Sequence, residues 1–446
     1  MCTPESPPRL KLPEIAQTWW PLAASWLLMA LELPAISAVM ARLANPKINL
    51  AAYGGIVYPM ALIIEAPIIM LLAASTALSK DWVSYKKIRR FMTLSGGILT
   101  ALHALVAFTP LYTFITEQII RAPPEIIQPA RTGLMIMLPW TWTIAYRRFN
   151  QGVLIRFGHS RTVGLGTVIR LSANGLVLSI GYVLKDVSGI VVATSAVAAG
   201  VISEAVYVGF RVQPVINNQL KPAPSATKEL TRQAFIRFYF PLALTSLMTL
   251  LSQSLISAAL SRMPRALDSL AIWPVISGLL FIFRSPGVAF NEVVVALLDK
   301  PRSSHSLIRF TALLVISSTA LLVLIAITPL SEWWFRYVSS LDPDLTRLAE
   351  TALLFGLLVP GANTLQSWYQ GAMLQSHNTR GIPEAVVVYL SVSLFVYGLG
   401  IYWYRSPGII MGTAGFSLGM CCQAGWLWYR SRPARQSINK RDEINQ

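Results

Sequence analysis

The chain has 446 residues, of which 54% are hydrophobic and only 13% are charged, and its mean hydropathy is +0.54. A soluble core of this size cannot hide so much apolar surface, so the composition excludes a water-soluble globular protein and indicates a polytopic membrane protein. The net charge of +17 comes from short Lys and Arg clusters between apolar segments, which is typical of loops on one side of a membrane and not of a nucleic-acid-binding surface.

A membrane-spanning helix needs about 20 mostly apolar residues, and twelve such stretches follow a proline-rich N-terminal segment, 1–17. The first apolar run is long and has no small-residue cleavage site, so we expect it to be retained as a span. A polar linker, 212–234, joins two halves, and a basic tail, 430–446, follows the last span. The predicted spans are 18–42, 50–78, 91–113, 130–148, 163–184, 188–211, 235–261, 267–298, 307–330, 345–373, 384–404 and 408–429.

The second half of the chain repeats the first. At an offset of 220, the stretch 21–42 matches the stretch 241–262 at nine of 22 positions. Six spans per half is an even number, so both repeats enter the membrane in the same orientation. We therefore predict an all-α protein with two six-helix lobes, 18–211 and 235–429, related by a pseudo-two-fold axis along the membrane normal. Prolines within spans are expected to break or bend helices: Pro34, Pro59, Pro67, Pro139, Pro274, Pro286 and Pro360.

Lys and Arg gather on the side of the membrane that holds the N-terminus, in clusters that include Lys86, Lys87, Arg147 and Arg148. By the positive-inside rule this side is cytoplasmic, so both termini are predicted to lie in the cytoplasm. We expect a multi-pass protein of the inner or plasma membrane. We also expect a monomer whose partners are the lipid bilayer and a small-molecule substrate, with no nucleic acid.

Ionisable side chains deep in a span cost about 2.5 to 3.5 kcal/mol each at the bilayer centre on insertion scales, so they are candidates for function. The alternative for each is a structural role, as a buried ion pair or a hydrogen-bonded core group. At an offset of 219, Glu65 corresponds to Arg284, so the repeated scaffold differs in its central charges. Acids suit ion coupling or gating, and cations suit an anionic substrate: Glu32, Glu65 and Glu204 are the coupling candidates, and Arg284, Arg170 and His103 the substrate-binding candidates.

A Gln-Gly pair followed by an arginine occurs once in each half, at an offset of 219. We expect each pair to close a hydrophobic helix at a polar loop, where the side chains could form a cytoplasmic gate. The alternative is a repeated helix cap together with the positive charge of cytoplasmic loops. The gate candidates are Gln151, Arg161, Gln370 and Arg380.

Enzyme motifs give no strong competing interpretation. Asp342 and Asp344 resemble a pair of metal-binding acids, but Asp344 directly precedes an apolar helical pattern and is predicted to be its N-cap. No Cys, His and Asp cluster has metal-ligand spacing, and no nucleotide-binding phosphate loop is present. We therefore predict no enzyme activity, no metal and no cofactor, with H+ or Na+ as the candidate coupling ion.

The whole chain resembles the multidrug/oligosaccharidyl-lipid/polysaccharide (MOP) flippase superfamily. The run 20–42 with LAAYGGIVY, the Arg284-Ser285-Pro286 region and QGVLIRFGHSRTVGLGT are most similar to the progressive ankylosis protein group and to multidrug and toxin extrusion (MATE) transporters. The resemblance implies a V-shaped pair of lobes, alternating access and export, and in the ankylosis group efflux of small organic or phosphate-bearing anions. It also implies that Glu32 matches the span-one acid used for ion coupling. The second lobe departs from the extrusion transporters, which often add acids where this chain offers mainly Arg284 and Glu292.

The sequence therefore predicts a secondary active or facilitative exporter of small, anionic organic solutes that works by alternating access. The alternative is a flippase of a lipid-linked sugar or another amphiphile, which would open the same cleft laterally to lipid. Glu65 and Arg284 each precede a proline by two residues, so they are predicted to pair across the lobes in at least one state.

Overall fold

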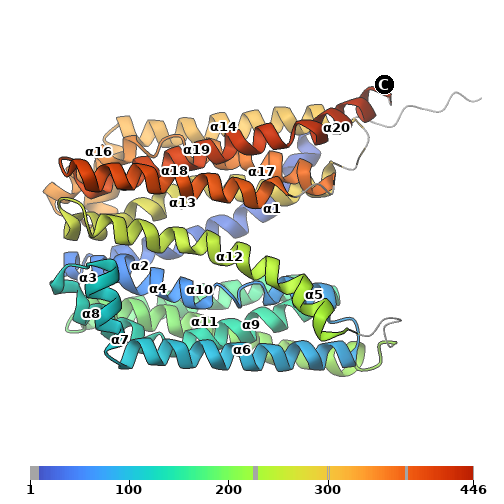
Figure 1. The fold of residues 1–446 in the computed structure, drawn as a ribbon, viewed down its shortest axis with the longest axis horizontal. Coiled ribbons are helices and arrows are strands. Elements are labelled where there is room, and N and C mark those ends of the chain that lie inside the picture. Colours follow the sequence, from blue (N-terminus) through green and yellow to red (C-terminus); the bar gives the residue numbers. More distant parts are fainter. Residues whose placement is uncertain (1–9, 225–229, 299, 301, 377–379, 445–446) are drawn as a thin grey trace, which may run out of the picture. The chain divides into compact units, whose positions relative to one another are not determined.

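The computed structural model describes residues 10–224, 230–298, 300, 302–376 and 380–444. Parts of the predicted N-terminal segment, linker and tail (1–9, 225–229 and 445–446) lie outside these ranges. The described residues form helices and no strand, which confirms the predicted all-helical class. They divide into two compact units, which can be followed in Figure 1: unit 1 is Met1–Pro34 with Pro274–Gln446, and unit 2 is Ala35–Trp273.

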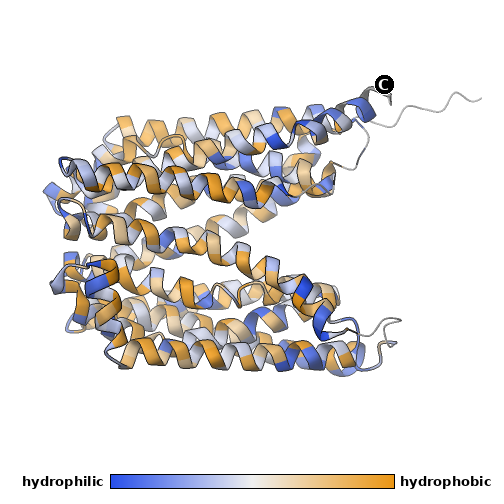
Figure 2. Ribbon diagram, viewed as in Figure 1, coloured by the Kyte–Doolittle hydropathy of each residue, from blue (hydrophilic) through white to orange (hydrophobic). Residues whose placement is uncertain are grey.

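Unit 1 contains α1 (Leu12–Ala30), the second part of α13 (Ala266–Leu297) and the helices that follow it. Helix α17 packs on α14 and α19, and α18 packs on α19. Figure 2 shows α14 as largely hydrophobic and α20 as largely hydrophilic, as expected for a span and a tail helix. The later helices are α14 (Ser304–Ile327), α15 (Leu330–Glu332), η4 (Trp333–Val338), α16 (Pro343–Leu354), α17 (Val359–Gln375), α18 (Gly381–Trp403), α19 (Gly408–Arg430) and α20 (Arg432–Ile444).

Unit 2 is organised around α9 (Leu138–Arg156), which packs on α5, α6 and α11. Helix α2 (Glu32–Met40) leads into this unit and the first part of α13 ends it. The other elements are α3 (Pro46–Ala52), η1 (Tyr53–Val57), α4 (Tyr58–Glu65), α5 (Leu71–Leu78), α6 (Trp82–Phe108), α7 (Leu111–Thr113), η2 (Phe114–Ile120), α8 (Pro124–Ile136), α10 (Ser160–Leu184), α11 (Gly189–Val215), η3 (Ile216–Leu220) and α12 (Arg232–Leu260).

Nine helical segments of the described chain are long and apolar enough to cross a membrane, and the bent pair α16 and α17 makes a tenth. The two remaining predicted spans are also helical, as α8 with α9 and as α19. The fourth predicted span, 130–148, has wrong boundaries. Its helices run from Pro124 to Arg156 with a break at Met137, so they extend beyond the predicted span at both ends.

The duplication is visible in the backbone as well as in the sequence. A non-glycine residue in the left-handed region costs about 1–2 kcal/mol, so such residues mark defined turns. Three pairs of them recur at offsets of 220, 219 and 219, and the short α-to-π step of α7 and η2 recurs 219 residues later in α15 and η4. The pairs are Asn45 with Arg265, Arg121 with Ser340, and Lys185 with Tyr404.

The compact units differ from the predicted lobes by one exchange, because α1 belongs to unit 1 and α12 to unit 2. Both unit boundaries fall at prolines within helices, where a backbone donor is missing. The indole Nε1 of Trp19 on α1 donates to the carbonyl of Pro286 at 2.9 Å, within unit 1. Ser254 on α12 donates to the carbonyl of Pro59 at 3.0 Å, within unit 2. The lobe boundaries of the sequence repeat stay a prediction.

Side-chain caps fix the first residues of several helices. Asp81 accepts a hydrogen bond from the backbone N–H of Ser84 at 2.7 Å and begins α6. Asp342 accepts from the N–H of Leu345 at 2.9 Å and begins α16. The prediction that Asp344 is the cap was wrong by two residues, because Pro343 already occupies the first helical position.

The repeated Gln-Gly pairs lie inside helices, where their glycines permit close helix packing. A Cβ built on Gly152 would lie 2.5 Å from the backbone oxygen of Leu72 and 2.6 Å from Cβ of Ser75 on α5. A Cβ on Gly371 would lie 2.4 Å from Cγ1 of Val294 on α13. The expectation that these pairs end their helices was wrong, and their shared role is contact between neighbouring helices.

Gly152→Ala is therefore expected to destabilise unit 2 by about 1–3 kcal/mol, because the backbone of α5 must move to admit one methyl group. Gly164→Ala on α10 is the matched control, since its Cβ would meet no atom within 4 Å. Alanine is the better helix former, so the control should be neutral or more stable. The midpoint of thermal unfolding in detergent measures both, and equal midpoints would contradict the packing role.

The tail helix α20 is fastened to the start of α14 by Asp442. Its Oδ1 accepts from the backbone N–H of Arg302 at 3.2 Å, and its Oδ2 accepts from that of Ser304 at 3.0 Å. Burial would raise the pKa of Asp442, but hydrogen bonds from Ser304 and the charge of Arg441 outweigh burial and hold this pKa below its ordinary value.

Asp442→Asn should loosen α20 by about 1 kcal/mol, because the amide has one acceptor oxygen and leaves one of the two backbone N–H groups without its bond to this side chain. Lowering the pH should loosen α20 in the wild type as well, because it protonates Asp442. Because the folded-state pKa is lowered, the stabilisation is fully present above the unfolded value of about 3.9 and is lost as pH falls through the folded value. Hydrogen exchange of the α20 amides measures this effect at neutral pH. Equal protection in variant and wild type would exclude the anchoring role.

Candidate functional site

Charged and polar side chains from four helices meet inside unit 2. They come from α4, α9, α10 and α11, and five of them are ionisable, of which four are buried and one is half-buried. We call this group the buried charge cluster: Glu65, Arg147, Arg148, Gln151, Arg170 and Glu204.

Glu204 on α11 is the centre of the cluster and is 1% exposed. Nη1 of Arg147 donates to its Oε2, and Nε2 of Gln151 donates to its Oε1 at 2.8 Å. Nε of Arg170 lies at an ion-pair distance of 3.7 Å from Oε2. Three partners from two other helices thus satisfy this carboxylate, which is the arrangement expected of a structural buried ion pair.

Glu65, the last residue of α4, has a different environment. It is 3% exposed, and its Oε2 has no hydrogen-bond partner among the described residues. The charges of Arg148, Arg147 and Arg170 act on its carboxylate from within the cluster. Buried polar groups are nearly always hydrogen-bonded, so an exception of this kind needs a functional or solvent explanation. Glu65 is therefore the acid of the cluster whose carboxylate can still bind another group, such as a proton.

Arg148 is the cation with unused hydrogen-bonding capacity. Its side chain is half-buried, its Nε is buried without a partner, and it forms no salt bridge with a described residue. Nε of Arg147 and Oε1 of Gln151 are also buried without a partner in the described part of the chain. With both acids ionised, the three guanidinium groups and two carboxylates of the cluster leave a net charge of +1.

Helix geometry explains how these groups meet. Arg147, Arg148 and Gln151 lie within two turns of α9, the central helix of unit 2. Gly166 on α10 leaves room for Glu204, because a Cβ there would lie 3.3 Å from Cγ of Glu204. Gly200 on α11 allows the backbone of α10 to approach closely at Arg170, because a Cβ on Gly200 would lie 3.0 Å from the backbone oxygen of Arg170.

The described part of the second repeat has no such cluster. At the offset of 219, the positions of four charged cluster residues hold neutral polar or aromatic side chains, and only the position of Glu65 holds a charge. In unit 1, for example, Nε2 of Gln366 donates to the carbonyl of Met420 at 2.8 Å. The equivalents of Arg147, Arg148, Arg170, Glu204 and Glu65 are Gln366, Ser367, Tyr389, Gln423 and Arg284.

Of the predicted substrate-binding residues, only Arg170 belongs to the cluster. His103 is buried, with Nε2 3.0 Å from the carbonyl of Leu134 and Nδ1 2.9 Å from Oγ1 of Thr141. A carbonyl only accepts, so Nε2 carries a proton, and the ring is a hydrogen-bonded core group as in the structural alternative. Arg284 is half-buried in unit 1, with its guanidinium 5.2 Å from the ring centre of Phe281.

The remaining coupling and gate candidates lie apart. Glu32 is half-buried at the start of α2 in unit 1, and its role in ion coupling or gating stays a prediction. Arg161 and Arg380 are exposed at the starts of α10 and α18, and Gln370 is half-buried in α17. Only Gln151 of the predicted gate lies in the buried charge cluster. The predicted pairing of Glu65 with Arg284 also stays a prediction, since these residues belong to different units.

Sequence reasoning missed Arg147 and Arg148. We counted both among the cytoplasmic charges at the end of the span 130–148, but they lie well inside α9, and Arg147 is 5% exposed. One signal could have found them. An acid as deep in a span as Glu204 requires a cationic partner at similar depth, and Arg170 was the only arginine of the first half that we predicted to lie deep in a span.

No protein-family model matches the sequence, and no curated protein matches it. Solved structures match over almost the whole chain. An inward-facing multidrug resistance MATE family transporter of the MOP superfamily has a TM-score of 0.71, with 14% identity over 96% of this chain and 99% of that one. The chain has the MATE transporter fold.

Two further structures with this fold support the same conclusion. A Vibrio cholerae MATE transporter has a TM-score of 0.64, with 18% identity over 96% of this chain and 98% of that one. A MOP superfamily transporter from Pyrococcus furiosus has a TM-score of 0.63, with 14% identity over 95% of this chain and 96% of that one. These matches confirm the predicted class, a multi-pass membrane protein with twelve helices in two lobes, and the resemblance to MOP proteins at the level of fold. The resemblance to the progressive ankylosis group stays a prediction.

Proposed function

We propose that this protein is a membrane transporter that exports small organic anions by alternating access. The MATE transporter fold supports transport in general. The observation that carries the choice of substrate is the net charge of +1 in the buried charge cluster, with unused donors on Arg148. In the Pyrococcus furiosus transporter, reversed polarity of the binding pocket suggests a different function. In this chain, a cluster with a net positive charge favours an anionic substrate.

An anionic group bound to Arg148 would compensate the charge of the cluster and satisfy buried donors. Guanidinium groups bind carboxylate and phosphate with two parallel hydrogen bonds, which adds orientation to affinity. Glu65 competes electrostatically for the same guanidinium. Protonation of Glu65 raises the net charge of the cluster to +2, so a proton and the anion bind with positive coupling, and each strengthens the other equally.

The direction of transport follows from the charge of the substrate. A membrane potential that is negative inside favours movement of an anion outward by about 2.3 kcal/mol per charge per 100 mV. Export can therefore be facilitative. Protonation of Glu65 then changes the rate of export, because it changes the affinity of the cluster for the anion. The proposal includes a monomer in the inner or plasma membrane with both termini in the cytoplasm.

Purified protein in liposomes tests the proposal. A potassium gradient with valinomycin sets the membrane potential, and release of trapped radiolabelled organic anions is compared with release of organic cations. We expect anions to leave at a rate that rises with an inside-negative potential. Liposomes without protein should release no anions, and liposomes with protein should release no cations. Transport of cations alone would contradict the proposal. Translocation of a lipid-linked sugar without anion release would favour the flippase alternative.

A further inference from the structure

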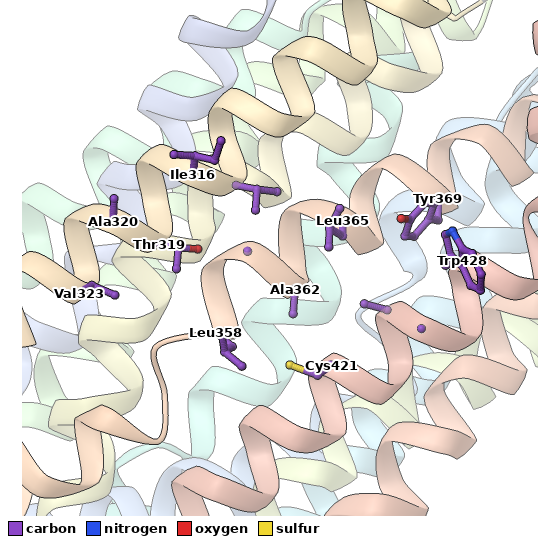
Figure 3. A pocket seen from close by; sticks show the side chains of 14 residues that line it. Ile316, Thr319, Ala320, Val323, Leu358, Ala362, Leu365, Tyr369, Cys421 and Trp428 are labelled. Carbon is purple, nitrogen blue, oxygen red and sulfur yellow. The ribbon is translucent and has the colours of Figure 1, made fainter.

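Unit 1 carries a groove of about 660 Å³ between α14, α17 and α19, on helices that do not contribute to the buried charge cluster (Figure 3). Small residues, including Gly361, Ala362 and Gly425, make room for it. Exposed apolar side chains stand along its rim, with Ile316 66% and Leu358 59% exposed. In a membrane protein such side chains face lipid, so the groove is open to the hydrocarbon.

The groove has the length of one membrane leaflet. Along α17 its lining runs from Leu358 to Tyr369, which at 1.5 Å per residue is roughly 16 Å. Half of a hydrocarbon core of about 30 Å is about 15 Å. The residues that Figure 3 labels along this length are aliphatic, except Thr319, Tyr369, Cys421 and Trp428. An extended acyl chain is the ligand that such a surface suits.

One end of the groove is cationic. Tyr369 and Trp428, both labelled in Figure 3, line this end. The guanidinium of Arg432 lies 4.2 Å from the ring centre of Trp428, and that of Arg435 lies 5.3 Å from that of Tyr369. Neither arginine forms a salt bridge with a described residue, whereas the nearby Arg430 is paired with Glu384 at 2.8 Å.

These observations place an apolar groove of leaflet length beside two arginines that form no salt bridge with a described residue. We propose that the groove binds an anionic phospholipid, with an acyl chain along α17 and the headgroup phosphate at Arg432 and Arg435. Charge complementarity selects the anionic headgroup, because arginine binds phosphate oxygens with charge-assisted hydrogen bonds. The cationic end lies at the C-terminal end of α19, which the sequence predicts to be cytoplasmic.

A variant that fills the groove tests the site without disturbing packing. A Cβ on Gly425 would meet no atom within 4 Å, so Gly425→Leu adds a side chain to open space and improves helix propensity. Gly398→Leu on α18 is the matched control, since Gly398 is equally open and does not line the groove. Arg432→Gln tests the headgroup end, with the exposed tail residue Lys440 changed to Gln as its control.

Native mass spectrometry of protein from nanodiscs containing phosphatidylglycerol and phosphatidylcholine counts the retained lipids. We expect the wild type to prefer phosphatidylglycerol. Gly425→Leu should lower its retention at least about tenfold, which is 1.4 kcal/mol, and Gly398→Leu should not. Arg432→Gln should reduce the preference for phosphatidylglycerol, and Lys440→Gln should leave it unchanged. Equal retention in the two glycine variants, or a wild type without a preference between the lipids, would overturn the proposal. Neither result depends on whether the protein transports anions.

Discussion

Replacing Glu204 with glutamine is expected to lower the free energy of unfolding by about 3 to 5 kcal/mol. The carboxylate is 1% exposed and binds Arg147, Gln151 and Arg170, so its loss leaves buried guanidinium charge without compensation. Glutamine keeps the volume of the side chain, which separates the effect of charge from that of a cavity. Thermal unfolding of the purified protein in detergent, followed by intrinsic fluorescence, gives the change in midpoint.

Two comparisons make this result specific. Glu384→Gln removes a half-exposed carboxylate that lies 2.8 Å from Arg430, and exposed pairs contribute only about 0–1 kcal/mol. Combining Glu204→Gln with Arg147→Met should cost less than the sum of the single changes, because the uncompensated charge is removed as well. A Glu204→Gln protein as stable as the wild type would exclude a structural role for this carboxylate.

Arg148→Gln should have the largest effect on transport. The change removes the positive charge in excess and the unused donors, so we expect the KM for the transported anion to rise at least about tenfold, the equivalent of one charge-assisted hydrogen bond. Stability should change little, because this side chain forms no salt bridge with a described residue and lies near other arginines. Initial rates of anion release from liposomes, measured across substrate concentrations, give the KM.

Arg156 supplies the control on the same helix. Its Nη1 donates to the carbonyl of Thr76 at 2.9 Å, outside the buried charge cluster. Arg156→Gln should therefore lower stability and leave the KM unchanged. If Arg148→Gln and Arg156→Gln affect the KM equally, Arg148 has no special part in anion binding.

Hydropathy was sufficient to predict the helical architecture. Each span must form its backbone hydrogen bonds within itself, and it places its apolar side chains in the protein core or against lipid. It failed at the fourth span. There the rule that charges lie in loops competed with the demand of Glu204 for buried partners, and Arg147 and Arg148 continue α9 into the cluster. The exchange of α1 and α12 between the compact units was also beyond the sequence, since it depends on contacts between distant segments.

The candidate site was predictable in part. Depth within a span identified Glu65, Glu204 and Arg170, because burial of charge is costly wherever it occurs. Depth alone could not separate the satisfied carboxylate of Glu204 from that of Glu65, whose Oε2 has no partner among the described residues. That difference depends on the positions of α9 side chains, one of which, Gln151, the repeat had placed at a helix end.

The central claim is that the buried charge cluster binds an anion in competition with the carboxylate of Glu65. Equilibrium binding of an organic sulfonate, whose own charge is constant with pH, tests it most directly with purified wild type and Glu65→Gln between about pH 8 and pH 5. We predict that the wild-type affinity rises as pH falls, because protonation removes the competing charge, and that Glu65→Gln keeps the high affinity at every pH. Weaker binding by Glu65→Gln, or an unchanged pH dependence in that variant, would contradict the account.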